Sequence, residues 1–359
     1  MRILLVTGSC PPMKCGVGDY SYNLAKSLSA DPHYRIGILT SYCVENAGTV
    51  DGIEIFPIMK KWNLTGVLSV VRLIRSWSPD VVHIQQPTQG YGKGQLHWIL
   101  PLVCFMMGRK VVETWHGAYG LEYTLKLILK AVVPGGLIYV HPHFIEDYHP
   151  LLRWVFLNKH CAFVPNASAI PKANLNELEI HDLRKHYIKN QKRLIVFFGF
   201  VYPHKGVELI FDIANSGSDQ IVIAGEIDEH GEYGQQLLQR YSTEEWQGKV
   251  TITGFLSVSD VASLLTVADA VVLPFRRGGG EWNTSIHGTV MQGTFVVTTS
   301  LTRNGYDNQN NVYYANPNDI QEMKQALDMY AGVKNDVSPG AYEDEWEQIA
   351  EAHRRVYEK

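Results

Sequence analysis

The chain has 359 residues, of which 45% are hydrophobic and 19% are charged, and this composition excludes a disordered protein. Because single hydrophobic cores rarely grow beyond about 250 residues, the length predicts two domains. The net charge of −4 is unevenly distributed, since residues 1–175 carry 16 Lys and Arg against 10 Asp and Glu, whereas the remainder carries 16 against 26. This asymmetry is either ordinary variation or a sign that the first half faces an anionic acceptor or a membrane surface.

The cysteines and the apolar runs limit the cellular context. The chain has five cysteines and no C-x-x-C pair, which indicates free thiols in a reducing compartment and argues against a disulfide scaffold or a zinc site. The opening run MRILLVTGSCPP is too short for a signal peptide and is expected to be a buried first strand. No run of about 18 uncharged apolar residues occurs, so we expect a cytoplasmic protein without a membrane span.

Short apolar runs alternate with helical patterns along both halves of the chain. In the first half, strands are predicted at 2–8, 35–41, 81–86, 110–117, 136–142 and 161–167. In the second half, they are predicted at 193–200, 220–226, 250–255, 269–275 and 294–300. Continuous apolar strands between helices are typical of parallel sheets covered on both faces. The polar segment 172–192 separates the two series and is the expected domain boundary.

Ligands bind beyond the carboxyl ends of the strands in an open α/β sheet, and most of the notable polar residues here follow such ends. After the first strand, Gly16 and Gly18 precede a helix that Asp19 or Ser21 could cap. Such a loop lets backbone amides approach an anion, although the spacing is not the G-x-G-x-x-G of a dinucleotide site. A ligand loop and a purely structural turn are both consistent with this pattern.

Histidines follow several of the predicted strands. His116 in VVETWHG is expected at a sheet edge, where it could donate a hydrogen bond or shuttle a proton, or it could be structural. His83 has a similar setting, but the sequence gives weaker support for a functional role. His141 and His143 form the tight pair HPH, but no acidic or cysteine ligand accompanies them, so no metal site is predicted.

The segment FFGFVYPHKGVELIFDIA places Lys205 near the first turn of a predicted amphipathic helix. A cation does not stabilise that end of a helix, so the position makes sense if Lys205 and the helix amides together hold a diphosphate. A solvated surface lysine is the alternative.

A second loop and helix lie at residues 275–292. The loop contains Arg276, Arg277, three glycines and Glu281. The helix that follows is expected to begin near the sequence NTS and to offer the backbone amides of Trp282, Asn283, Thr284 and Ser285 to a phosphate. A polar loop without a ligand is the alternative.

Together these segments resemble those of a GT-B glycosyltransferase of the retaining, nucleotide-sugar-dependent family 4 type. The matching segments, in chain order, are GVGDYSYNLAKSL, PDVVHIQQP, VVETWHG, VPNAS, FGFVYPHKGVELI, VIAGE, GFLSVSDVASLLTVADAVVLPF, MQGTFVVTTS and WEQIAEAHRRVYEK. The resemblance implies two doubly wound, Rossmann-like α/β domains that face each other across a cleft. Residues 1–175 would bind the acceptor, 176–340 the donor, and the terminal helix at 341–359 would return to the first domain.

The resemblance also implies roles for individual residues. The donor diphosphate would be held by Lys205 and helix amides, without a metal or a separate cofactor. His116 matches a histidine that contacts the donor sugar near the reacting carbon, and Gly16 and Gly18 match a first-domain loop near the phosphates.

The chain departs from the family pattern at several positions. Phe200 stands where an arginine is common, and Arg276 or Arg277 could supply that charge. A pair of glutamates in the family falls at Gly280 and Gly288. Glu281 could replace the first of them, whereas the second, which would bind the ribose, has no evident replacement.

We therefore expect a hexosyltransferase that moves a sugar from a nucleotide-diphosphate sugar to a glycan or lipid-linked glycan in polysaccharide or glycoconjugate biosynthesis. His116, Lys205 and Glu281 would be its catalytic residues, and no nucleic acid partner is expected. A sugar-nucleotide epimerase on the same fold and a non-catalytic binding protein with a degenerate donor site remain open. The lysine-containing apolar segment 123–136 is either a helix at the inner face of a membrane or a core helix with two solvated lysines.

Overall fold

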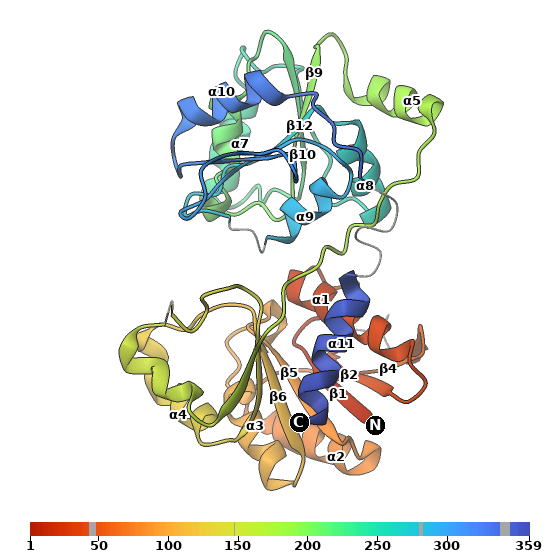
Figure 1. Cartoon of the computed structure of the whole chain (residues 1–359), viewed down its shortest axis with the longest axis vertical. Coiled ribbons are helices and arrows are strands. Elements are labelled where there is room, and N and C mark those ends of the chain that lie inside the picture. The colour runs from red at the N-terminus through yellow and green to blue at the C-terminus, as the bar shows by residue number, and fades with distance from the viewer. Residues whose placement is uncertain (43–47, 147, 280–282, 338–344) are drawn as a thin grey trace. The chain divides into compact units, whose positions relative to one another are not determined.

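The structure is a computed structural model that describes residues 1–42, 48–146, 148–279, 283–337 and 345–359. The chain forms two compact units (Figure 1): unit 1 contains Met1–Ala167 and Glu343–Lys359, and unit 2 contains Ser168–Tyr342. The division follows Ala167, whereas the sequence places it after residue 175. The reason is that the chain between these two positions already bonds to unit 2, since the Ala173 amide donates to Gln292 Oε1 at 2.9 Å. Helix α5 (Glu177–Tyr187), in the polar segment expected to separate the domains, also belongs to unit 2. Its Arg184 pairs with Asp269 at 2.7 Å.

Unit 1 is built on an eight-stranded sheet in the order β3-β4-β2-β1-β5-β6-β7-β8. Strands β3 and β4 pair antiparallel, and the other neighbours pair parallel. The strands are β1 (Arg2–Val6), β2 (Arg35–Ser41), β3 (Gly48–Val50), β4 (Ile53–Met59), β5 (Val81–Gln86), β6 (Lys110–Trp115), β7 (Gly135–Tyr139) and β8 (Lys159–Phe163).

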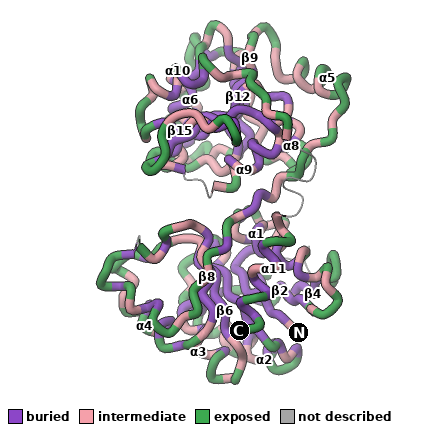
Figure 2. The backbone as a smooth tube through the Cα atoms, in the orientation of Figure 1, coloured by how far each residue is buried: buried purple, intermediate pink, exposed green. Residues whose placement is uncertain are grey.

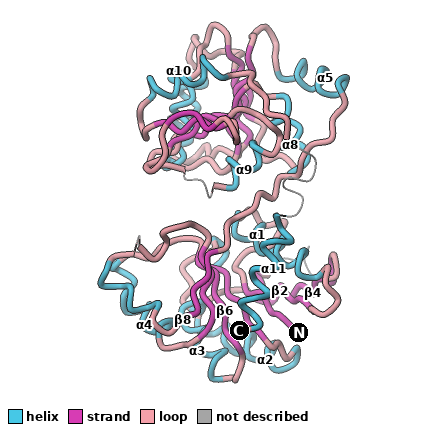
Figure 3. The backbone as a smooth tube through the Cα atoms, viewed as in Figure 1, coloured by secondary structure: helices cyan, strands magenta, loops and turns pink. Residues whose placement is uncertain are grey.

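Helices cover both faces of this sheet (Figure 3). Successive residues of β1 face opposite sides, as a strand requires. Ile3 and Leu5 pack in one core with α1 and α11, whereas Leu4 and Val6 pack in another with α2 and α3. The helices of unit 1 are α1 (Gly16–Ser29), α2 (Val67–Trp77), α3 (Leu96–Met106), α4 (Thr124–Ala131) and α11 (Glu345–Glu358).

Helix α4 buries a lysine together with the apolar residues Leu127 and Ala131. Lys130 is fully buried and lies 2.7 Å from Glu113, which also accepts from Lys159 at 3.1 Å. Lys126 lies over the ring of Trp98, while Leu125 is 81% exposed. The interpretation of this segment as a core helix is supported by Leu127 and Ala131, which are part of the core, but the expectation of two solvated lysines is wrong, because Lys130 is buried.

Unit 2 is built on a seven-stranded sheet in the order β11-β10-β9-β12-β13-β15-β14. Only the β14–β15 pair is antiparallel among its described pairings. The strands are β9 (Arg193–Phe198), β10 (Asp219–Ala224), β11 (Val250–Ile252), β12 (Ala270–Leu273), β13 (Val296–Thr299), β14 (Gly305–Asp307) and β15 (Val312–Ala315). The helices are α5, α6 (Ile210–Ile213), α7 (Glu232–Tyr241), α8 (Val258–Val267), α9 (Thr284–Val290) and α10 (Ile320–Tyr330).

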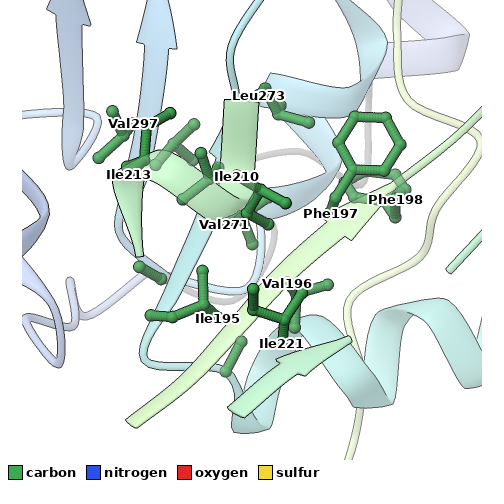
Figure 4. Packing of buried hydrophobic residues seen from close by; sticks show 14 of the residues in the cluster. Ile195, Val196, Phe197, Phe198, Ile210, Ile213, Ile221, Val271, Leu273 and Val297 are labelled. Atoms are coloured by element: carbon green, nitrogen blue, oxygen red, sulfur yellow. The ribbon is translucent and has the colours of Figure 1, made fainter. Parts of the chain in front are cut away.

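The core of unit 2 lies along its central strands. Figure 4 shows Val196 and Phe197 of β9 with Val271 of β12 and Ile210 of α6 in one apolar cluster. The buried residues follow the strands of each unit, and the exposed ones gather on loops and outer helix faces (Figure 2). The two doubly wound α/β sheets expected from the sequence are thus confirmed. Among the described residues, no helix has the length and apolar character needed to cross a membrane.

Candidate functional site

Three cationic residues of unit 2 follow the ends of β9 and β12: Lys205, Arg276 and Arg277. Gly199, which follows β9, has φ 121°, a backbone conformation that favours glycine. A Cβ atom added there would lie 3.7 Å from Ser285 Oγ in the first turn of α9. The loop after β9 therefore passes beside α9, and the amide of Arg276 joins it to the loop after β12 by donating to His204 O at 3.1 Å.

Lys205 lies in the loop after β9, where it is half-buried. Its Nζ lies 4.3 Å from the centroid of the Phe275 ring, close enough for a cation–π interaction. Burial lowers the pKa of Lys205 to about 8, and no carboxylate within the described part of the chain pairs with it. A partly desolvated ammonium without a carboxylate is suited to an anionic ligand.

The amphipathic helix predicted after Lys205 is present but short. It consists of a 3₁₀ turn at Val207–Leu209 and the four-residue helix α6. Gly206 has φ 65°, and a Cβ atom there would lie 2.4 Å from Pro274 O. The close approach of the β12 loop therefore makes the chain turn sharply after Lys205 and prevents a continuous helix.

Helix α9 begins where the sequence predicts, but one of its amides is already engaged. Asn283 is the N-cap residue, and its Oδ1 accepts from the Ser285 amide at 3.0 Å. The expectation of an open amide at Ser285 is therefore wrong, because an N-cap side chain takes that donor. Thr284 is exposed at the start of the helix, and Gly280, Glu281 and Trp282 lie outside the described residues.

Arg276 is held by a carboxylate that sequence reasoning does not single out. Glu208 pairs with Arg276 and also accepts from the hydroxyl of Tyr233. Arg276 also approaches Asn318 Oδ1 at 3.4 Å. A phosphate would have to compete with Glu208 for Arg276, whereas Lys205 has no such competitor among the described residues. The only sequence signal for Glu208 is its place three residues after Lys205 in KGVE.

Gly288 accommodates another part of unit 2. A Cβ atom added at Gly288 would lie 2.8 Å from Ser168 Oγ and 3.1 Å from Ile170 Cγ1. Ser168 Oγ in turn accepts from the Ile170 amide at 3.0 Å. The segment that enters unit 2 therefore packs against α9 at the position where the family pattern would place its second glutamate.

Gly288→Glu should not create a ribose-binding carboxylate. We expect it to lower the free energy of unfolding by about 1–3 kcal/mol, as overpacking of a buried position does, with no gain in nucleotide-sugar affinity. Gly288→Ala should have a smaller effect, because the helical preference for alanine of about 1 kcal/mol offsets part of the clash. Urea unfolding and calorimetry measure the two quantities. A Gly288→Glu protein of unchanged stability would contradict this explanation.

Gly16 and Gly18 lie inside α1 rather than in a loop before it. Cys15 is the N-cap residue, so neither Asp19 nor Ser21 caps the helix as expected. A Cβ atom at Gly18 would lie 2.9 Å from Ser9 O, whereas one at Gly16 would meet nothing within 4 Å. Packing of α1 on the loop after β1 thus accounts for Gly18, and nothing in the structure explains Gly16.

His116 follows β6 at the edge predicted for it and is half-buried. Its Nε2 lies 2.9 Å from Gln85 Oε1, and its ring meets that of Tyr20 edge-on with centroids 4.8 Å apart. Burial, followed by the nearby His353, lowers the pKa of His116 to about 3. The imidazole is therefore neutral near pH 7 and acts as a hydrogen-bonding group rather than as a cation.

His83 and His141, which the sequence also indicates as candidates, form hydrogen bonds with neighbouring groups of the protein. His83 is fully buried, with Nδ1 at 2.7 Å from Tyr357 OH and Nε2 at 2.8 Å from Thr114 Oγ1. His141 Nδ1 lies 3.1 Å from Pro142 O. Among the described residues, no group of three or more His, Cys, Asp or Glu is arranged to hold a metal ion.

The buried histidines should make unit 1 sensitive to acid. Burial is the main cause that lowers the pKa of His97 and His116 to about 3, that of His353 to about 4, and that of His83 well below its usual value. An unfolded histidine has a pKa of about 6.5, so the unfolded chain binds more protons between these values. The stability is complete above pH 6.5 and falls as the pH drops, by about 1.4 kcal/mol per histidine for each pH unit.

The variant His353→Gln tests this dependence. Between pH 7.5 and 5.5 its free energy of unfolding should fall by about 1.4 kcal/mol less than that of the wild type, since one buried titrating group is gone. Asp19 opposes the trend in both proteins, because burial raises its pKa to about 6. The exposed His160→Gln is the matched control and should behave as the wild type in urea unfolding. Equal losses in all three proteins would refute the assignment.

Comparisons with known proteins relate one segment of the chain to a family. Residues 192–331 match the model of the glycosyl transferases group 1 family. The match covers less than half of the chain and lies within unit 2. The matched segment contains Lys205, Arg276, Thr284 and Ser285, while Gly16, Gly18 and His116 lie outside it, in unit 1.

Individual relatives share parts of the chain or its fold. An alpha-D-kanosaminyltransferase of Streptomyces kanamyceticus is 31% identical over 100 residues, which span 26% of this chain and only 25% of that relative. Anabaena Alr3699/HepE in complex with UDP-glucose has a TM-score of 0.70 at 15% identity, covering 99% of this chain and 100% of the other. A glycosyltransferase from Rickettsia africae ESF-5 has a TM-score of 0.68 at 15% identity, covering 99% and 93%. The two units thus have the Rossmann-like folds of GT-B proteins.

Proposed function

We propose that the chain is a retaining glycosyltransferase that transfers a sugar from a nucleotide-diphosphate sugar to a glycan or lipid-linked glycan. The observation that carries the proposal is the half-buried Lys205, which lies at the carboxyl end of β9 within the family-matched segment and has no carboxylate partner among the described residues. The structural relative from Anabaena was solved with UDP-glucose, which makes a UDP-sugar the first donor to test.

In the proposed reaction, the chain stabilises the leaving diphosphate by fixed charge and hydrogen-bond donors. Lys205 holds the diphosphate, and the exposed start of α9 at Thr284 supplies a neighbouring positive helix end. The bond from the anomeric carbon to the diphosphate oxygen breaks as the acceptor oxygen approaches from the same face. The acceptor proton passes to the leaving diphosphate, so no metal is required for the charge balance.

His116 and Glu281 complete the proposal on the strength of the family resemblance. The neutral imidazole of His116 would exchange a hydrogen bond with a hydroxyl of the donor sugar. Glu281 would supply the carboxylate for the same sugar. A lipid-linked acceptor would bring unit 1 to a membrane surface, and α4 with its C-cap residue presents the exposed Leu125, Ile128 and Val132 for such a contact.

Substitution of Lys205 tests the diphosphate site without knowledge of the acceptor. Lys205→Met should weaken UDP binding about 10- to 100-fold, because it removes a charge-assisted hydrogen bond worth about 1.5–3 kcal/mol. Lys249→Met is the control, since Lys249 only donates to Glu245 O on the surface. Isothermal titration calorimetry measures both affinities.

The pH dependence of binding gives a second readout of the same residue. Lys205 loses its charge as the pH rises through about 8, so UDP affinity of the wild type should fall above that pH. Lys205→Arg should show no such fall, because a guanidinium stays charged. Unchanged UDP affinity in Lys205→Met, or identical pH profiles of the wild type and Lys205→Arg, would remove Lys205 from the site. If a donor is bound and altered without any acceptor, the epimerase alternative is favoured.

A further inference from the structure

A chain of hydrogen bonds joins His116 to the last helix of unit 1. His116 Nε2 lies 2.9 Å from Gln85 Oε1, and Gln85 Nε2 lies 3.2 Å from His83 Nε2. His83 Nδ1 lies 2.7 Å from the hydroxyl of Tyr357 on α11. Gln85 and His83 are 0% exposed and Tyr357 is 1% exposed. Water therefore does not compete for these bonds, and leaving one of them unmade in the interior is costly.

The side-chain amide of Gln85 fixes which groups donate and which accept in this series of hydrogen bonds. Its oxygen can only accept, so His116 must carry its hydrogen on Nε2. Its nitrogen can only donate, so His83 accepts at Nε2 and donates from Nδ1 to Tyr357 OH. Thr114 Oγ1, at 2.8 Å, is placed to donate to the same Nε2 of His83. His116 is therefore held as the tautomer in which Nδ1 keeps its lone pair.

Helix α11 also supports His116 from a second side. The ring of Tyr20 meets His116 edge-on, and its hydroxyl lies 3.4 Å from Nε2 of His353 on α11. His353 Nδ1 donates to Ile349 O at 2.7 Å, so its Nε2 is free to accept from Tyr20. Two routes thus run from one helix at the end of the chain to a single imidazole after β6.

We propose that Tyr357 and His83 are positioning residues for His116. Through Gln85 they fix the imidazole in the tautomer whose Nδ1 accepts a hydrogen bond from a hydroxyl of the donor sugar. The proposal rests on the role that the proposed function gives to His116. A network that orients a histidine by hydrogen-bonding its other nitrogen is a general means of fixing its tautomer.

The test removes one hydroxyl and measures the tautomer directly. In Tyr357→Phe, the ¹⁵N NMR signals of the His116 ring should change from one tautomer, protonated on Nε2, to a mixture of both. The control is Tyr34→Phe, because the hydroxyl of Tyr34 donates to Glu358 of the same helix at 3.0 Å but is outside the chain of bonds. Gln85→Leu interrupts the chain next to His116 and should reproduce the mixture even if Tyr357→Phe does not fold.

Kinetics and binding connect the tautomer to function. Tyr357→Phe should lower the turnover of a UDP-sugar about 5- to 20-fold while leaving UDP affinity within about twofold, since UDP has no sugar for His116 to contact. Tyr34→Phe should leave both unchanged. A His116 signal that is the same in the wild type, Tyr357→Phe and Gln85→Leu overturns the proposal, as does wild-type His116 protonated on Nδ1.

The outcome also separates this proposal from the proposed function. If the tautomer changes as expected but His116→Ala turns over the UDP-sugar as the wild type does, the role of His116 in catalysis is overturned together with the purpose given to the network. If Lys205→Met abolishes UDP binding while the His116 tautomer is the same in the wild type and in Tyr357→Phe, the diphosphate site is supported and the positioning role is overturned.

Discussion

Burial of the strands on both faces is the constraint on which the candidate site depends. Every residue of β5, β10 and β12 is buried, so a polar side chain along these strands needs a partner inside the protein, as His83 and Gln85 of β5 have in each other. The chain becomes accessible only where a strand ends, and parallel strands end at the same edge of their sheet. Lys205 and Arg276 therefore follow β9 and β12, and His116 follows β6. Within each unit, the same packing that stabilises the sheet brings these residues to one edge.

Close contacts between neighbouring loops then fix the residues at that edge. Gly206 allows the loop after β9 to lie against Pro274 O, and the Arg276 amide bonds to His204 O. The half-buried Lys205 is held between these contacts, over the ring of Phe275. In unit 1, the network through Gln85 and His83 does the same for His116. Preorganised donors of this kind need little rearrangement when a ligand arrives.

The pattern of apolar residues was sufficient to predict the main strands and the sheet edge, at the carboxyl ends of the strands, where the candidate site residues lie. β4 is not evident from the sequence, because Pro57 interrupts the run IEIFPIM, although a strand near a sheet edge tolerates proline. The placement of Lys205 and His116 beyond strand ends follows from local sequence. In contrast, the pairing of Glu208 with Arg276 and the cap at Ser285 depend on exact loop geometry, which apolar patterning does not encode.

Contacts between segments that are distant in the sequence cannot be predicted from local sequence patterns. His83 and Tyr357 are 274 residues apart, and no spacing rule relates them. Gly288 is similar, because the neighbours that require it, Ser168 and Ile170, belong to a segment more than a hundred residues earlier. The inward-facing Lys130 of α4 depends on Glu113 of β6. In each case a residue that looks unusual in the sequence is explained by a partner from another element.

The edge formed after β9 and β12 is the proposed binding site for the diphosphate of a nucleotide sugar. Amide hydrogen exchange with and without UDP tests it most directly, because it locates the bound ligand without an acceptor. We expect slower exchange in residues 199–206 and 275–279 when UDP is bound, and no such change in Lys205→Met at the same UDP concentration. Protection confined to other parts of the chain, with these two segments unchanged, would contradict it.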